Sequence, residues 1–311
     1  SFPKISSMEP ESTFSSRLQT FQELTNPHYL MYGKRHVAWA QSPSPKTPEE
    51  QEIADRVIRV AAHPDTKEAI PRAFRFGAAI PYNICIGMAM AHPAVMLSVA
   101  RSAGIHWINQ TYNCAVNFAN RNASSVVDTS VLLQTYAAAC TLSVSIALAA
   151  TIVMRRYSLS GWKLTAVRGV LPMLAASTAS VANVAMIRRS EWIDDGVHVI
   201  DEEGTNHGMS KRAGTEGIWK CSVTRAVMNI PIITIPVFLA AGLTRFRVFR
   251  PSVPLDLSCA VGGVSLGVPM CLALYPQRER IEAKKLEPEF HHRVLRDGRT
   301  PITHFYYNKG L

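Results

Sequence analysis

Five long apolar stretches between residues 77 and 275 constrain this chain more than any other feature. They lie near residues 77–100, 136–154, 169–187, 226–243 and 257–275. The second and third carry no charged side chain over about the length that a bilayer requires. Charged residues make up 18% of the chain, below the roughly 25% of a typical soluble protein. The sequence therefore predicts an all-α membrane protein with about five transmembrane helices, rather than a soluble protein with five buried helices.

Two of the stretches contain residues that shape a helix. Pro81 and Pro93 lie in the first stretch and predict that it is kinked or broken, because proline removes a backbone donor. Gly263 and Gly267 lie in the fifth stretch at GxxxG spacing, which permits close contact between helices.

Polarity divides the chain into three parts. Residues 1–76 form a polar N-terminal region, residues 77–275 hold the predicted transmembrane domain, and residues 276–311 form a basic C-terminal segment without a further span. Inside the transmembrane domain we expect an amphipathic helix at residues 104–121 outside the five spans. We also expect a polar, carboxylate-rich loop at residues 188–221.

The polar loop and the number of spans lead to two further predictions, one about a hairpin and one about the location of the termini. A short hairpin is expected through Val197–Ile200. An odd number of spans would place the two termini on opposite sides of the membrane. Lys and Arg are then divided almost evenly between the two sides, so the positive-inside rule gives no orientation.

Net charge and cysteine content narrow the classes of partner. The net charge of +10 suggests nucleic acid or an anionic lipid surface. Basic residues do not cluster with aromatic ones as in a nucleic-acid-binding motif, so membrane lipid is the expected partner. The six cysteines are scattered singly, which predicts neither a metal site nor a disulfide framework. We also expect no cofactor and no N-terminal signal peptide, so internal segments should direct the chain to its membrane.

A polar stripe marks the predicted helix at residues 104–121. Asn109, Asn113, Asn117 and Arg121 recur every four residues and fall on one helical face. Asn is a poor helix former, so helix propensity does not explain the choice. Two interpretations stay open: the amides bond neighbouring loops, or they present uncharged donors and acceptors to a polar cavity.

Three polar residues within the predicted spans point to the same two alternatives. Asn183 lies in the third span, and Arg225 and Asn229 lie one helical turn apart at the start of the fourth, just before Pro231. Polar groups inside a membrane are costly and usually face a cavity or a partner. Amides beside a proline-interrupted segment are typical of a transporter's substrate site. Hydrogen bonding between helices is the alternative for each residue.

The segment His63, Pro64, Asp65 and Thr66 is expected to be a structural motif. Asp65 precedes Glu68 by three residues, as in a capping box, so we expect these residues to cap and anchor the segment that enters the first span. No nucleophile or metal ligand accompanies them, which argues against an enzyme.

The chain resembles the sideroflexins, and the resemblance covers nearly its whole length. The matching residues are Ser12, Thr13, Phe14, Arg17, His63, Pro64, Asp65, Thr66, Asn109, Gln110, Asn113, Asn117, Asn120, Arg121, Arg188, Glu191, Gly196, Asp201, Glu202, Gly204, Arg225, Pro231, Pro236, Pro276, Gln277 and the ending 308–311. The resemblance implies a five-span protein of the mitochondrial inner membrane. It also implies transport of serine and related small neutral amino acids, with links to one-carbon metabolism and to iron and haem homeostasis.

The chain departs from the family pattern at a few positions, which raises a second function. The departures fall at Glu9-Pro10-Glu11, Lys67, His106, Ser180 and Ala185. The glycine of the family motif after Thr66 is Lys67 here, and the third span lacks a family amide and a proline. The expected function is a carrier for serine-like amino acids. The alternative is a structural subunit that has lost transport and associates with other inner-membrane proteins.

Overall fold

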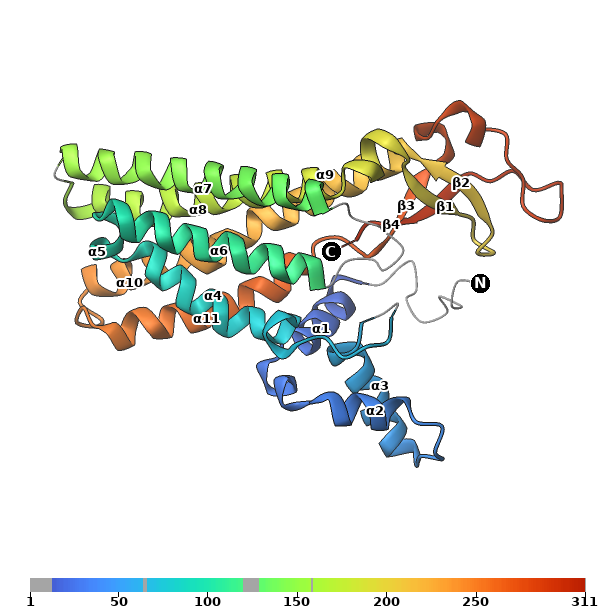
Figure 1. Ribbon diagram of the computed structural model, residues 1–311, viewed down its shortest axis with the longest axis horizontal. Helices are drawn as coiled ribbons and strands as arrows, with labels where there is room; N and C mark the ends of the chain where they lie inside the picture. The colour runs from blue at the N-terminus through green and yellow to red at the C-terminus, as the bar shows by residue number, and fades with distance from the viewer. Residues whose placement is uncertain (1–12, 64–65, 120–128, 158, 311) are drawn as a thin grey trace.

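A bundle of long helices forms most of the molecule (Figure 1). The computed structural model describes residues 13–63, 66–119, 129–157 and 159–310. Within these residues, four helical segments are long and apolar enough to cross a membrane. They are α7 (Thr129–Tyr157), α8 (Gly161–Ile187), the continuous unit of α9 (Lys211–Asn229), η4 (Ile230–Thr234) and α10 (Ile235–Arg245), and α11 (Val253–Leu272). They cover the last four predicted stretches, so the all-α membrane class is confirmed.

The first predicted span is broken, as Pro93 indicated. Its apolar part is the shorter helix α4 (Phe76–Ala91), and the one-turn helix α5 (Pro93–Met96) follows it. The chain then reverses into α6 (Val99–Ala119), so residues 77–100 are not one continuous span. Proline cannot donate the hydrogen bond that would continue α4, and His92 instead caps α5 by accepting from the backbone N–H of Ala94 at 3.2 Å.

Helix α6 differs from the amphipathic helix expected outside the spans, because it lies within the bundle beside α7 (Figure 1). His106 Nδ1 and Ser143 Oγ of α7 are 2.9 Å apart, and both side chains are buried. The described residues thus make six passes along the bundle, through α4, α6, α7, α8, α9 to α10, and α11.

The even number of passes brings both ends of the chain to one end of the bundle. Arg17 of α1 (Phe14–Leu24) donates through Nε to the carbonyl of Ala273, just beyond α11, at 2.9 Å. Near the C-terminus, the backbone N–H of Lys309 donates to the carbonyl of Gln277 at 2.8 Å. The expectation that the termini lie on opposite sides is therefore wrong, because α6 adds a pass that hydropathy does not reveal.

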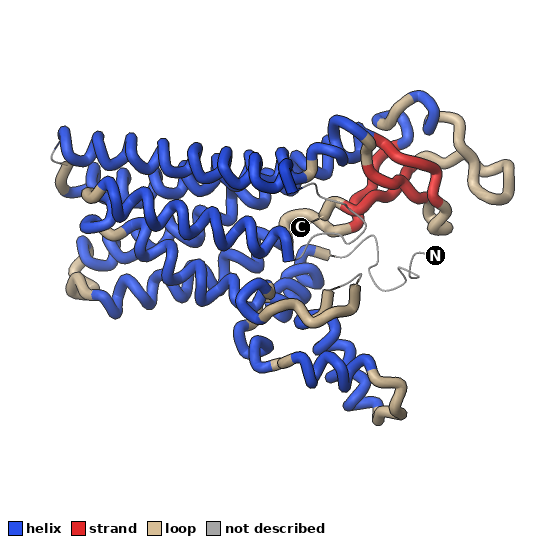
Figure 2. Tube along the Cα trace, viewed as in Figure 1, coloured by secondary structure: helices blue, strands red, loops and turns tan. Residues whose placement is uncertain are grey.

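A four-stranded antiparallel sheet stands at this end of the bundle (Figure 2). Its order is β2-β1-β4-β3, with bounds β1 Val197–Ile200, β2 Asn206–Ser210, β3 Arg278–Glu282 and β4 His304–Asn308. The short helices η5 (Ala283–Lys285) and η6 (Pro288–Phe290) pack against it, whereas η3 (Ser190–Asp194) leads into β1 and contacts α9. The expected hairpin is confirmed as β1 and β2, whereas α9 begins at Lys211, inside the segment expected to be loop.

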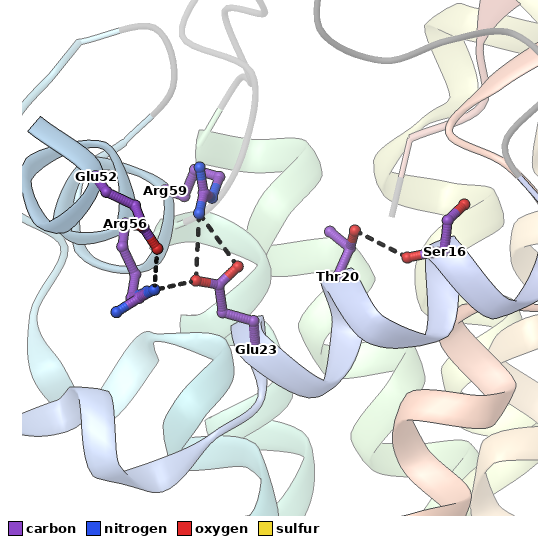
Figure 3. A network of polar contacts seen from close by, with 6 residues as sticks. All are labelled: Ser16, Thr20, Glu23, Glu52, Arg56 and Arg59. Atoms are coloured by element: carbon purple, nitrogen blue, oxygen red, sulfur yellow. Dashed lines mark hydrogen bonds and ion pairs between the residues drawn. The ribbon is translucent and has the colours of Figure 1, made fainter. Parts of the chain in front are cut away.

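The N-terminal region folds into a small helical unit beside the same end of the bundle. It contains α1, η1 (Pro27–Met31), α2 (Lys34–Gln41), α3 (Pro48–Ala61) and η2 (Arg72–Phe74). Glu23 of α1 accepts hydrogen bonds from Arg56 at 3.0 Å and from Arg59 at 3.2 Å, both on α3 (Figure 3). Phe21, two residues before Glu23 and so on the opposite side of α1, is buried in the core of the bundle. Helix α1 therefore joins the N-terminal unit to the membrane helices.

Candidate functional site

A cavity lined by both polar and apolar side chains lies in the half of the bundle nearest the two termini. Its volume is about 70 Å³, and residues from the end of α1 and from α4, α6, α8, α9 and α11 line it. The polar side chains on its wall are Thr25, Arg75, Asn83, Asn109, Gln110, Tyr112, Asn113, Ser180, Asn183, Arg225 and Asn229. No aspartate or glutamate occurs among the described residues that line it. The cavity wall therefore combines two guanidinium groups with several neutral amides.

Helix α6 supplies one wall because of the spacing of its amides. Asn109 and Asn113 are four residues apart and both face the cavity. Trp107 and Ile108 point to the opposite face and are 55% and 50% exposed. A helix with its amides inward and its large apolar side chains outward suits a position between a polar cavity and lipid.

Gln110 is the most deeply buried amide of this wall, with 1% of its surface exposed. Neither its Oε1 nor its Nε2 has a hydrogen-bond partner among the described residues. An unpaired buried polar group costs roughly 1–3 kcal/mol of stability. A side chain of this kind is suited to bind a solute that enters the cavity.

Helices α8 and α9 form the opposite wall, and a short chain of hydrogen bonds connects them. Asn229 Nδ2 donates to Ser177 Oγ at 3.2 Å and to the carbonyl of Arg225 at 3.0 Å. Ser177 Oγ in turn donates to the carbonyl of Ala226 at 2.9 Å. These contacts fix the register of α9 against α8, so that Arg225 and Asn183 face the same cavity.

The helix changes its winding directly after Asn229. Segment η4 is a π-helical turn, in which the N–H of Ile235 donates to the carbonyl of Ile230. Pro231 lies at its start and lacks a backbone N–H, so it cannot support regular α-helical bonding there. The loosened turn lies beside the cavity, whose lining includes Ile232.

One side of the cavity contacts the N-terminal unit through Arg75. Arg75 is 3% exposed and donates to the carbonyls of Ile70 at 2.8 Å and Tyr32 at 2.6 Å. Burial lowers the pKa of Arg75, with a smaller effect from Arg72, although an arginine stays charged at neutral pH. Tyr112 of α6 donates to the carbonyl of Ala73 at 2.9 Å. Its ring stacks on the ring of Tyr82 of α4. This side of the cavity is thus held by bonds to backbone carbonyls.

The structure brings most of the sequence-predicted residues together. Five of them line the cavity, namely Asn109, Asn113, Asn183, Arg225 and Asn229. The side chain of Asn117 and the whole of Arg121 lie outside the described residues. Sequence reasoning missed Gln110 as a site residue, although its spacing of three from Asn113 places both on one helical face.

The segment 63–66 lies away from this cavity and closes a tight turn. The backbone N–H of Thr66 donates to His63 Nδ1 at 3.3 Å, and the N–H of His63 donates to the carbonyl of Glu68 at 2.8 Å. Pro64 and Asp65 lie outside the described residues. The next helix begins at Arg72. Because Asp65 lies outside the described residues, the expected cap stays a prediction.

Metal ligands do not gather in the parts of the chain that the structure describes. No group of three His, Cys, Asp or Glu side chains there could hold a metal ion. The six cysteines are all free.

Comparisons with known proteins all point to one family. The family model described as Sideroflexins matches residues 8–311. The sideroflexin of Dictyostelium discoideum is 30% identical, over 100% of this chain and 98% of its own length. Sideroflexin-3 of Rattus norvegicus is 30% identical over 97% and 95%, and Sideroflexin-5 of Homo sapiens is 28% identical over 97% and 90%. No solved structure matches the chain.

Fold and cavity together define the class: a multi-pass helical membrane protein with a cavity between its helices that is lined by polar and apolar side chains. The match over nearly the whole length then gives the family. The chain belongs to the sideroflexins.

Proposed function

We propose that this protein is a carrier for serine or a related small neutral amino acid in the mitochondrial inner membrane, where it supports one-carbon metabolism. The observation that carries the proposal is the cavity beside Arg225, which is lined by amides and, among the described residues, by no carboxylate. Arg225 would bind the substrate carboxylate through charge-assisted hydrogen bonds, and amide oxygens would accept from the ammonium group. The carrier needs no cofactor and performs no covalent chemistry.

The size of the cavity and the helix beside it support this proposal. A volume of about 70 Å³ has room for several water molecules, since one needs about 10–15 Å³. This suits a solute of few heavy atoms. The π-helical turn at Pro231 gives α9 and α10 a point at which they can move relative to each other. Interrupted helices beside a polar site are common in transporters.

The test is serine uptake by liposomes that contain the purified full chain. We expect Arg225→Gln to reduce uptake at least tenfold, because it removes the charge that a carboxylate requires, while the protein stays folded and abundant. Arg189→Gln is the matched control, since Arg189 is exposed and pairs only at the surface with Asp194 at 3.6 Å. It should leave uptake unchanged.

Two outcomes would contradict the proposal in different ways. Full uptake by the Arg225→Gln protein would show that Arg225 does not bind the substrate. No uptake by the unmodified chain would favour the other function that its departures from the family pattern raise. That function is a structural subunit associated with other inner-membrane proteins.

A further inference from the structure

The amide of Gln110 differs from that of Asn229, which also lines the cavity. Asn229 uses its amide donor within the protein, toward Ser177 and Arg225. Gln110 is 1% exposed, and neither polar atom of its amide has a partner in the described part of the chain. Gln110 is one of the residues that line the cavity, and a rotation of its side chain would present these two buried groups to a bound solute.

The chemistry of a primary amide narrows which group of a solute it can bind. The amide offers one acceptor and one donor side by side. A carboxylate only accepts and would leave Oε1 unpaired, while an ammonium only donates and would leave Nε2 unpaired. A hydroxyl both donates and accepts, so one hydroxyl oxygen can satisfy both groups of the amide in a closed ring of two hydrogen bonds.

We propose that Gln110 is the specificity-determining residue of this cavity and that it recognises the side-chain hydroxyl of a small hydroxylated amino acid. This inference rests on the proposed carrier function, in which Arg225 takes the carboxylate. A site built to bind a hydroxyl rejects an analogue that lacks it, since the buried amide is then left unpaired. The expected discrimination between serine and alanine is about tenfold or more.

The test compares serine and alanine uptake by the full chain in liposomes. The unmodified protein should prefer serine, and Gln110→Met should bring the ratio of the two uptake rates close to one. Methionine has a similar size and no amide. Gln134→Met is the matched control, because Gln134 lies on α7 with an exposed side chain. It should keep the preference for serine.

Thermal unfolding of the purified protein supplies a readout that a structural role would not share. Without solute, Gln110→Met should unfold at the same temperature as the unmodified protein or at a higher one, because a buried unpaired amide is removed. The stabilisation by added serine should fall to that given by alanine. A lower unfolding temperature, with serine stabilisation intact, would overturn the inference and assign Gln110 to the fold.

The remaining outcomes are also decisive. Uptake without preference for serine, or a preference that survives Gln110→Met, would overturn the inference and leave the carrier function standing. No uptake by the unmodified chain would contradict the carrier function. In that case, a rise in unfolding temperature that serine gives to the unmodified protein and not to Gln110→Met would still support recognition of the hydroxyl. If Gln110→Met fails to fold, Gln110→Asn takes its place in the test. Asparagine keeps the amide on a side chain shorter by one methylene, so the preference for serine over alanine should fall. A preference left unchanged in that protein would overturn the inference.

Discussion

At the scale of the residue, Lys67 has a backbone conformation that lysine rarely adopts. Its φ is +60°, in the left-handed region that favours glycine. The turn around it is held by the bond from the N–H of Lys67 to the carbonyl of His63 at 3.0 Å, and Gln41 donates to the carbonyl of Lys67. The family resemblance expects glycine at this position, and the turn explains why.

Replacing this lysine should therefore stabilise the protein. We expect Lys67→Gly to raise the free energy of unfolding by about 1 kcal/mol, since a left-handed conformation costs an ordinary residue roughly 1–2 kcal/mol and glycine loses some entropy in return. Chemical denaturation of the purified protein measures the change. Lys163→Gly, an exposed position within α8, should instead lower stability by about 1 kcal/mol. A loss of stability in Lys67→Gly would contradict this account of the turn.

At the scale of the element, two glycines set the distance between α11 and the fourth predicted span. An added Cβ at Gly263 would lie 2.8 Å from the carbonyl oxygen of Pro231, and one at Gly267 would meet the ring of Pro231. The close contact that the GxxxG spacing predicted is confirmed. Both contacts are made to Pro231, the proline in the π-helical turn.

A side chain at this contact should separate the helices. We expect Gly267→Ala to lower the free energy of unfolding by about 1–3 kcal/mol, because the added methyl overpacks a close contact. Gly262→Ala is the control, since no heavy atom lies within 4 Å of its added Cβ. Thermal unfolding in detergent compares the two variants. Equal stability of both would show that the contact is looser than the structure has it.

Helix α6 shows why part of the architecture could not be predicted from sequence. Hydropathy detects helices that face lipid on most sides, and it found the last four stretches for this reason. The polar side of helix α6, where His106, Gln110 and Asn113 lie, faces the bundle and the cavity. These polar residues lower the mean hydropathy of the helix, so a hydropathy search does not identify it as a span. The amide spacing did predict a helix with a polar face, but not what that face contacts.

At the scale of the whole molecule, the extra pass changes the arrangement of the ends. The N-terminal unit, the sheet and the C-terminal segment all gather at one end of the bundle (Figure 1). The hairpin of the sheet was predictable from local sequence. The pairing of Val199 with Tyr307 was not, because more than a hundred residues separate the two strands and local patterns carry no register over that distance.

This arrangement also explains how distant residues meet at the cavity. Thr25 and Arg75 come from the N-terminal part of the chain, whereas Arg225 and Leu272 come from its second half. Sequence reasoning identified Asn109, Asn113 and the polar residues of α8 and α9 because each stood out within an apolar or helical pattern. It missed Arg75, which lies in a polar region where arginine is common and no pattern marks it.

Equilibrium binding of labelled serine to the purified protein tests the central claim most directly. The claim is that the cavity beside Arg225 is the binding site for a small amino acid. We predict saturable binding at one site per chain, at least tenfold weaker in Arg225→Gln and unchanged in Arg189→Gln. Binding that the loss of the Arg225 charge leaves intact, or no saturable binding up to millimolar serine, would contradict it.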